Sequence, residues 1–329
     1  TSATTTAAIT AKSLTASYTA NDKTYDGTTS ATVVGSLNSV VSGDTVTLAN
    51  TSATFADKNV GTGKTVTISG LSLGGTDAGN YTLSSTSTTT TAAITAKSLT
   101  ASYTASDKTY DGSRTATVSA SSSDIVTGDA VTISHSSATF DDKNVGTGKT
   151  VSISGISLSG TDAGNYSLAS TSASASAAIS AKSITVSFTA SDKTYNGSDA
   201  ATVSGSSSDV VSGDVVTFSA GSATFADKNV GIGKTVTIST LLKTGTDANN
   251  YSISNTSATT TAAITAKSLT ASYTANDKTY DGTTSATVVG SLNSVVSGDT
   301  VTLANTSATF ADKNVGTGKT VTISGLSLG

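Results

Sequence analysis

The chain offers few residues for catalysis, and its single histidine is the clearest example. His135 occurs in only one of several repeated segments, and cysteine is absent. Nucleophilic catalysis needs a base held beside an activated hydroxyl or thiol. A histidine without a recurring partner is better interpreted as an exposed strand residue, so we expect no enzymatic activity.

The segment Gly61–Lys64, with the sequence GTGK, is only superficially similar to a phosphate-binding loop. Lys58 occupies the position where the motif GxxxxGK[ST] requires its first glycine. The motif also needs a helix after it, whose N-terminus faces the phosphate. No helix is expected here, and we interpret the segment as a β-turn whose glycines adopt positive φ.

Four oxygen-bearing residues are candidate calcium ligands, namely Asp22, Asp26, Asp77 and Asn80. Calcium takes six to eight oxygen ligands, yet the acids are spread out and form no D-x-D-x-D cluster. An Asx-turn, in which the side chain accepts a hydrogen bond from the backbone two residues on, explains such positions without a metal. We therefore expect no cofactor, with calcium as the weaker alternative.

Recurring lysines and asparagines allow a second chemistry, an isopeptide crosslink between Lys and Asn promoted by a nearby acid. The candidate residues are Lys23, Lys58, Lys64, Asn59 and Asn80, with Asp57 or Asp77 as the acid. Small secreted domains often gain stability from disulfides, and a chain without cysteine must gain it in another way. Each crosslink would release ammonia, so the intact mass tests this hypothesis.

Several aromatic and glycine residues are predicted to be structural. Tyr81, Tyr166 and Tyr251 each lie two residues before Leu or Ile, which favours core packing with the hydroxyl bonded to the backbone over sugar stacking. The other predicted structural residues are Tyr25, Gly27, Phe55, Gly61, Gly63, Tyr110, Phe140, Tyr195 and Phe225.

A repeat of 85 residues positions all of these side chains. The string KTY(D/N)G begins at Lys23, Lys108, Lys193 and Lys278, each 85 residues after the last. The string F(A/D)DKNVG begins at Phe55, Phe140, Phe225 and Phe310, and DA(G/N)NY begins at Asp77, Asp162 and Asp247. Such self-similarity is the signature of a tandem array.

The repeat predicts the division into domains. Residues 256–329 repeat residues 1–74 without a change, so three units form a block of 255 residues. We predict that residues 1–9 are the last strand of a preceding repeat. The ranges 10–94, 95–179 and 180–264 are predicted to be β-sandwich repeats, and 265–329 to be a repeat truncated before its final strands.

Composition and patterning predict an all-β fold. The sequence lacks Cys, Pro, Met, Trp, Glu and Gln, and Thr and Val favour strands. The unit 95–179 contains about seven short alternating segments with turn signals every 8–12 residues, the pattern of an immunoglobulin-like antiparallel β-sandwich. Asp142–Gly148 is predicted to be a loop and Gly155 a bulge. Parallel pairing is not expected, because no crossover helix is present.

The connection between units predicts a stiff array. Thr171–Ser187 runs from the end of one unit into the next without Gly or Pro. Flexible linkers are rich in Gly and stiff spacers often carry Pro. A nearly continuous strand should therefore join the domains into an extended rod.

Charge and hydropathy narrow the partners. The formal net charge of −4 argues against nucleic acid, which needs clustered Lys and Arg. No apolar stretch approaches the roughly 18 residues of a membrane span. Neighbouring repeats are the expected partners, and strand edges without Glu or Pro also allow lateral self-association into fibres.

The three motifs together resemble the YDG-domain family of mostly-β, glycine-rich repeats. The matching strings are KTYDGT, FADKNVGTGKTVTISGLSL and GTDAGNYTL, and they cover nearly the whole chain. The resemblance implies a secreted bacterial surface protein of filamentous-haemagglutinin type. The third unit departs from it at Asn196, Ile232, Asn249 and Leu241–Lys243, so the aspartate of the first motif is not needed for chemistry in every unit.

The leading interpretation is an extracellular stalk or fibre of a bacterial adhesin, which projects a binding tip or mediates attachment. A self-assembling filament or surface-layer component of a biofilm matrix is the second. A repeated carbohydrate-binding module is the third, and it is disfavoured because aromatic residues make up only 5% of the chain.

Overall fold

The structure is a computed structural model that describes residues 1–329. It is all-β, and its only helices are three single 3₁₀ turns, η1(Ala78–Asn80), η2(Ala163–Asn165) and η3(Ala248–Asn250). None of these has the length and apolar character that crossing a bilayer requires. The chain divides into two compact units, Thr1–Thr109 with Ser113–Ser180, and Tyr110–Gly112 with Ala181–Gly329.

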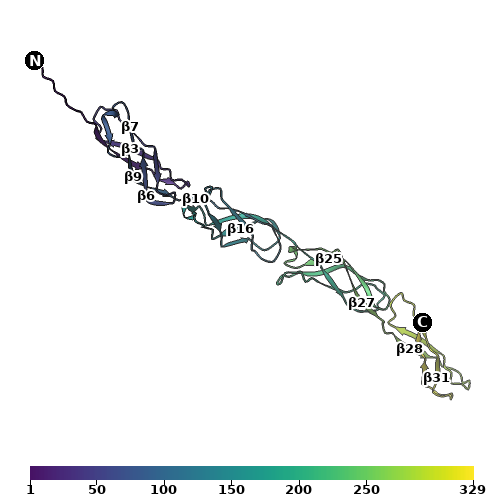
Figure 1. The fold of residues 1–329 in the computed structure, drawn as a ribbon. Coiled ribbons are helices and arrows are strands. Elements are labelled where there is room, and N and C mark those ends of the chain that lie inside the picture. The colour runs from purple at the N-terminus through teal and green to yellow at the C-terminus, as the bar shows by residue number, and fades with distance from the viewer. The chain divides into compact units, whose positions relative to one another are not determined.

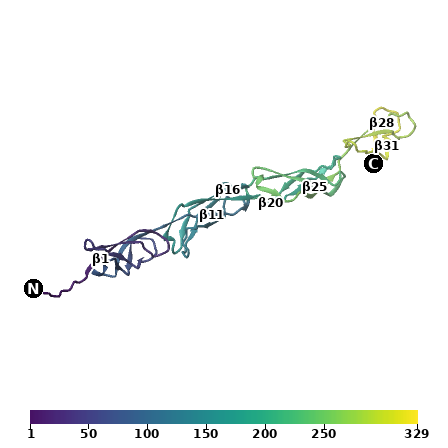
Figure 2. The same cartoon turned by 90° about the horizontal axis from the view of Figure 1, so that it is seen from above.

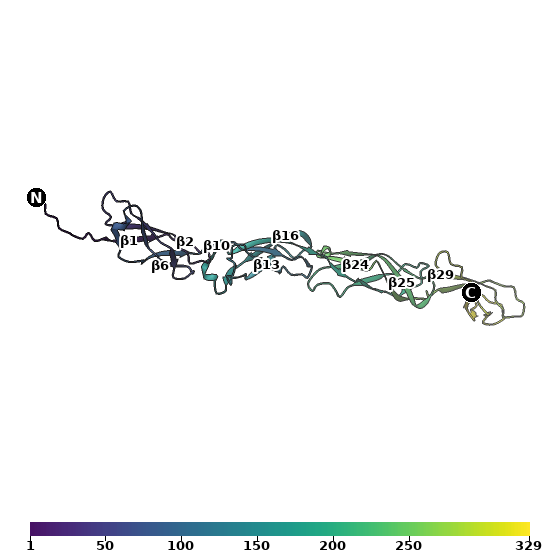
Figure 3. The same cartoon turned by 45° about the horizontal axis from the view of Figure 1, so that its top comes forward.

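The first repeat contains three small sheets (Figures 1 and 3). Their strand orders are β2-β9-β6-β5, β3-β1-β8 and β4-β7. The strands are β1(Lys12–Ala20), β2(Lys23–Thr24), β3(Val33–Asn38), β4(Thr47–Ala49), β5(Ser52–Phe55), β6(Gly61–Ser69), β7(Ser72–Gly74), β8(Tyr81–Leu83) and β9(Ser87–Thr95).

The second repeat has the same arrangement, with β11 and β16 marked in Figure 2. Its sheets have the orders β12-β19-β16-β15, β11-β13, β10-β18 and β14-β17. The strands are β10(Lys97–Leu99), β11(Ser102–Ala105), β12(Lys108–Thr109), β13(Val118–Ser121), β14(Thr132–Ser134), β15(Ser137–Phe140), β16(Gly146–Ser154), β17(Ser157–Ser159), β18(Tyr166–Leu168) and β19(Ser172–Ser180).

The second unit contains the third and fourth repeats. In the third, one sheet of order β21-β23-β24-β25-β27-β22 accompanies the pair β20-β26, and the fourth has the pairs β28-β29, β30-β33 and β31-β32. The strands are β20(Lys182–Ile184), β21(Ser187–Ala190), β22(Lys193–Thr194), β23(Val203–Ser206), β24(Thr217–Phe225), β25(Gly231–Thr244), β26(Tyr251–Ile253), β27(Ser257–Thr265), β28(Thr270–Ala275), β29(Val288–Asn293), β30(Leu303–Ala304), β31(Ser307–Phe310), β32(Val321–Ser324) and β33(Ser327–Leu328).

Alternation along the strands builds the core. In β6, Val66 and Ile68 are fully buried, while the residues between and beside them are exposed Thr and Ser. Ile94 of β9 and Phe55 of β5 complete the same layer. Each such aliphatic side chain contributes about 1.5–3 kcal/mol when buried, so the apolar alternation carries the fold of a repeat that lacks disulfides.

Not all pairing is antiparallel, and this corrects the expectation from the sequence. β1 pairs with β8 in parallel, with Lys12 opposite Tyr81, and β2 pairs with β9 in parallel, with Lys23 opposite Ile94. A parallel pair needs a crossover of a dozen or more residues. Here the intervening strands of the same repeat provide that crossover, so no helix is required.

The glycine-rich segment after the second motif forms a bulge rather than the end of a loop. β16 begins at Gly146, inside the range predicted to be a loop. Gly146 lies opposite Ile179 and Lys149 lies opposite Ala177, so β16 carries one extra residue between these pairs. Gly148, within the bulge, has φ +62°.

The bulge predicted at Gly155 is wrong. Ser154 pairs with Ser137 and Ser157 pairs with Ser134, so equal numbers of residues separate the pairs and the register is kept. Gly155 has φ +65° and ends β16. The break lies in both strands of the hairpin at once, which divides it between two sheets.

A reciprocal exchange explains why this break is missing from the third repeat. In the first repeat Gly70 has φ +66°, and a Cβ there would lie 2.0 Å from Oγ1 of Thr51. In the third repeat the residue types are swapped: Thr240 has φ +56°, and a Cβ on Gly221 would lie 2.9 Å from Cβ of Thr240. One of the two facing positions must therefore be glycine. With the swapped order, β24 and β25 continue through the crossing.

Residues 1–11 form no strand, in contrast to the strand predicted over 1–9. Ile9 is fully exposed, whereas Ile264, at the same place in the identical segment 256–264, is buried in β27. β27 pairs along its length with β25. Backbone groups of a strand need such a partner, and residues 1–11 have none in the structure.

Candidate functional site: the joint between repeats

The recurring motifs meet where the first repeat contacts the second, within the first compact unit. We call this contact the joint. The first repeat contributes the turn at Tyr25–Gly27 and the loop Lys58–Val60. The second repeat contributes Asp129 and its loop, together with η2 and Tyr166, the residue that follows it.

Asp129 is the centre of the joint. Its carboxylate accepts hydrogen bonds from the hydroxyls of Tyr25, at 2.7 Å, and Tyr166, at 2.6 Å. The Lys58 ammonium lies 2.7 Å from the same carboxylate and 3.2 Å from that of Asp162. Tyr25 and Lys58 belong to the first repeat, so a carboxylate that is only 2% exposed joins the two domains.

Asn165 adds a second polar link. Its Oδ1 accepts a hydrogen bond from the backbone N–H of Val60 at 2.9 Å, and its Nδ2 donates to Oδ1 of Asn59 at 3.2 Å. The Asn165 side chain is buried. Buried polar groups must be paired, so these bonds fix the position of the loop 58–60 against the next repeat.

Apolar contacts surround these bonds. The rings of Tyr25 and Tyr166 meet edge to face, with centroids 5.5 Å apart. Leu99 and Tyr166 of the second repeat belong to the same buried cluster as Phe55, Val66 and Ile68 of the first. The core thus continues from one repeat into the next.

Gly27 brings the two backbones together. It has φ +82°, and a Cβ there would lie 2.8 Å from Cγ1 of Val126 in the second repeat. Only glycine combines this backbone conformation with so close an approach. The glycine of the first motif is therefore required for the joint as well as for its own turn.

The hydrogen bonds shift the acidity of the joint residues. Burial alone would raise the pKa of the Asp129 carboxyl, but hydrogen bonds from Lys58, Tyr166 and Tyr25 outweigh it and lower that pKa. Burial, followed by the bond to Asp129, raises the pKa of Tyr166 to about 12. The bond to Asp129 also raises the pKa of Lys58. At neutral pH the joint therefore has one carboxylate, one ammonium and two neutral phenols around its centre.

The second unit contains the same arrangement. Tyr110 and Tyr251 donate to the Asp214 carboxylate at 2.7 Å and 2.5 Å, with their rings 5.4 Å apart. A Cβ on Gly112 would lie 2.7 Å from Cγ1 of Val211. The geometry is therefore a property of the repeat.

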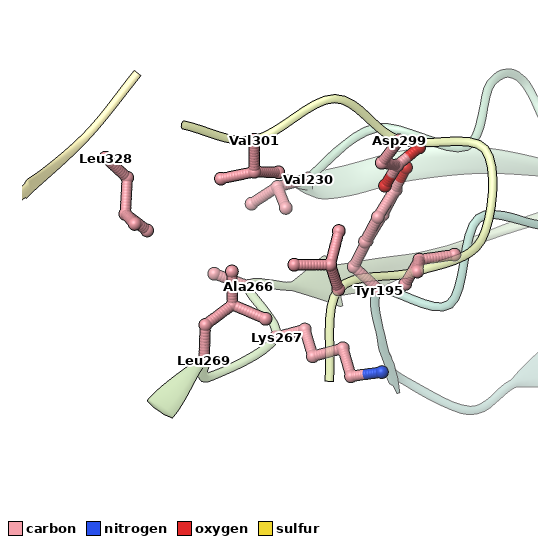
Figure 4. A pocket seen from close by; sticks show the side chains of 10 residues that line it. Tyr195, Val230, Ala266, Lys267, Leu269, Asp299, Val301 and Leu328 are labelled. Carbon is pink, nitrogen blue, oxygen red and sulfur yellow. The ribbon is translucent and has the colours of Figure 1, made fainter. Parts of the chain in front are cut away.

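The contact between the third and fourth repeats is more open. The Lys228 ammonium lies 3.4 Å from the Asp299 carboxylate. Figure 4 shows Tyr195 beside Asp299 at the edge of a pocket that both repeats line. The described fourth repeat ends at Gly329, so no tyrosine of the Tyr166 kind packs against Tyr195. The residues lining the pocket are Tyr195, Val230, Ala266, Lys267, Leu269, Val295, Val296, Asp299, Val301 and Leu328.

The calcium candidates lie apart, each with another partner. Asp22 accepts a hydrogen bond from Ala93 N at 2.6 Å, and Asp77 accepts one from Thr45 N at 2.8 Å. Asp26 bonds Thr28 N, two residues on, and Lys23. The Asx-turn is thus confirmed at Asp26 but wrong at Asp77, whose partner is distant in sequence. The backbone N–H of Asn80 donates to the carbonyl of Asp77.

The isopeptide candidates form ion pairs. Lys64 lies 2.7 Å from Asp57, and Lys23 lies 2.7 Å from Asp26 and 5.7 Å above the ring of Phe55. Lys58 and Asn59 both belong to the joint, as described above. The polar partners of these lysine ammonium groups are carboxylates, a hydroxyl and a backbone carbonyl, and none is an asparagine side chain.

The predicted structural residues divide into three groups. Phe55, Phe140 and Phe225 are buried in the cores, each below a lysine ammonium. Gly61 and Gly63 form the bulge, and Tyr81 bonds both Asp44 and the backbone of Val41. Tyr25, Gly27, Tyr110, Tyr166, Tyr195 and Tyr251 lie at contacts between repeats. His135 is exposed and meets the ring of Tyr103 edge to face.

Sequence reasoning missed Asp129, although a signal for it exists. A Gly-Asp pair recurs with the 85-residue period at Gly43–Asp44, Gly128–Asp129, Gly213–Asp214 and Gly298–Asp299. Three of these aspartates bind tyrosine of their own repeat or of the one before. A recurring acid close to no other motif was the available clue.

No curated protein matches the chain. The model of one family, described as the YDG domain, matches four segments, residues 10–91, 95–173, 180–262 and 265–329. These matches start and end near the boundaries of the 85-residue repeat. They cover most of the sequence, and the chain therefore belongs to the YDG domain family.

Proposed function

We propose that this chain is a stalk segment of a secreted bacterial surface adhesin, in which YDG domains of immunoglobulin-like sandwich type are locked end to end into a stiff rod. The observation that carries the proposal is the joint. Residues from all three recurring motifs are spent on contacts between consecutive domains, around a carboxylate that is almost fully buried.

Such contacts suit a mechanical role. In a one-dimensional array, stability is the sum of the repeat stabilities and the nearest-neighbour interfaces. Interfaces between domains of one chain usually resemble transient contacts and allow relative motion. A shared apolar core with a paired buried charge restricts that motion, so force applied at one end is transmitted to the other.

The secretion, the bacterial surface and the adhesin context rest on the family resemblance alone. The coding sequence around this segment tests them. We expect the same reading frame to encode an export signal and a separate binding domain. A reading frame that places the repeats beside a catalytic domain would contradict the adhesin assignment.

The rod is tested by small-angle X-ray scattering on the 329-residue chain. We expect one extended shape for the wild type and a broader distribution of dimensions for the variant Tyr25→Ala/Tyr110→Ala. Tyr280→Ala is the matched control, because Tyr280 has the same sequence surroundings as Tyr25 but is exposed. If the double variant scatters as the wild type does, the joints do not set stiffness and the proposal fails.

A further inference from the structure

The turn at Asn196–Gly197 differs from its counterparts in the other repeats. The other three repeats have Asp-Gly here, at Asp26, Asp111 and Asp281, and this is the one Asn-Gly pair in the sequence. Asparagine followed by glycine is the pair most prone to intramolecular attack on the side-chain amide, because glycine places no side chain beside its nitrogen. The third repeat therefore carries an amide where its neighbours carry the corresponding acid.

The geometry of the turn favours that attack. Asn196 is exposed, and its Oδ1 accepts a hydrogen bond from Ser198 N at 3.1 Å, which polarises the amide carbonyl. This Asx arrangement folds the side chain back over the following backbone. Gly197 has φ +80°, and its N–H donates no hydrogen bond in the structure. The nitrogen that must attack is thus unoccupied, and the carbonyl that it attacks is held.

We propose that Asn196 is a site of spontaneous deamidation, which converts the third repeat to the acid found in the other three. The Gly197 nitrogen loses its proton and bonds to Cγ of Asn196, and the side-chain amide leaves as ammonia. Water then opens the five-membered imide at either carbonyl. The products are aspartate, or isoaspartate in which the main chain runs through the former side chain. The balance is one water consumed and one ammonia released.

The two products have opposite consequences nearby. Lys193 donates to the backbone carbonyls of Ser198, at 2.6 Å, and Ala200, at 2.9 Å, and to no carboxylate. Aspartate at position 196 supplies the ion pair that Lys23 makes with Asp26 and Lys278 makes with Asp281.

Isoaspartate instead adds a methylene to the backbone beside Gly197. A Cβ on Gly197 would already lie 2.7 Å from Cγ1 of Val296 in the fourth repeat. The lengthened backbone has no room to keep this contact, and Tyr195, one residue before Asn196, lies in the same contact region. The site therefore ages the contact between two domains of the second unit.

Peptide mass spectrometry of the intact folded chain, incubated at mildly alkaline pH, tests the proposal. We expect a mass gain of about 1 Da, from exchange of NH2 for OH, at Asn196 before any other asparagine. Methylation of the product by a protein isoaspartyl methyltransferase identifies the isoaspartate fraction. Asn196→Gln should abolish both signals, and Asn196→Asp should show neither the mass gain nor early methylation.

Asn38 and Asn293, which precede serine, are internal standards. Conversion of Asn196 no faster than of these two would overturn the proposal. Conversion that occurs only in urea would also overturn it, because the folded turn would then be protective. Neither result bears on the stiffness of the array, so the two proposals fail independently.

Discussion

The first and last 74 residues of the chain are identical in sequence but not in structure. Tyr25 is 2% exposed, whereas Tyr280, its exact counterpart, is 59% exposed. β6 has nine residues, and β32, within the same sequence, has four. The first copy has a strand partner in β9 and a following repeat above its tyrosine, and the described last copy has neither. The motif residues are therefore buried by neighbours rather than by their own domain.

The largest contrast should come from the tyrosines themselves. We expect Tyr25→Ala to lower the local free energy of unfolding of the first repeat by about 3–5 kcal/mol, since it empties a buried aromatic site. Tyr280→Ala should change the last repeat by less than about 0.5 kcal/mol. Hydrogen exchange of β6 and β32, followed by mass spectrometry, measures both. Equal losses would show that the tyrosine stabilises its own domain.

The carboxylates give the next largest contrast. Asp129→Ala leaves the Lys58 ammonium and two phenols without their shared acceptor, and we expect a loss of about 2–3 kcal/mol. Asp299→Ala removes one longer ion pair at 3.4 Å from an open site, and should cost well under about 1 kcal/mol. Thermal unfolding of the two variants compares them. A larger effect at Asp299 would contradict the central role assigned to Asp129.

A smaller contrast separates two glycines. Gly27→Ala and Gly282→Ala both place a Cβ at φ near +80°, which costs about 1–2 kcal/mol. Only Gly27 also meets a following valine, since nothing lies within 4 Å of a Cβ on Gly282. We expect Gly27→Ala to cost about 1 kcal/mol more, measured by denaturant unfolding. Equal costs would mean that Val126 moves aside freely.

The smallest expected effect is that of pH in the neutral range. The lowered pKa of Asp129 contributes stability above the ordinary carboxyl pKa of about 3.9, and this is lost as the pH falls through the lower folded value. The raised pKa of Tyr166 contributes stability that is complete below about pH 10 and is lost towards about 12. The melting temperature should thus be flat from about pH 5 to 9. Tyr166→Phe should remove the alkaline loss only, and an unchanged alkaline slope would assign it to other groups.

Much of the single domain could be predicted from the sequence. Alternation of Val66 and Ile68 with threonine places them inward, and the structure confirms the buried tyrosines and phenylalanines. Gly155 illustrates a limit, because positive φ at a glycine does not reveal whether a residue has been inserted or a strand has ended. Only the pairing of Ser137 and Ser134 distinguishes the two.

The joint could not be predicted, for a physical reason. Tyr25 and Asp129 are bonded across 104 residues, and in a periodic sequence each tyrosine has an equivalent aspartate at several separations. Nothing local shows whether Tyr25 serves Asp44 of its own repeat or Asp129 of the next. Burial of Asn165 is hidden in the same way, because a polar residue in a turn is normally exposed.

The exchanged pair Thr51 with Gly70, and Gly221 with Thr240, restricts how such an array can change by recombination. A crossover between the coding regions of the first and third repeats that falls between these two positions yields a hybrid with threonine at both places, or with glycine at both. The first hybrid brings a Cβ to 2.0 Å from a hydroxyl oxygen, and the second pairs two flexible residues at a strand crossing. Crossovers elsewhere keep a compatible pair. The number of repeats can therefore grow and shrink freely, while this hairpin is inherited as one block.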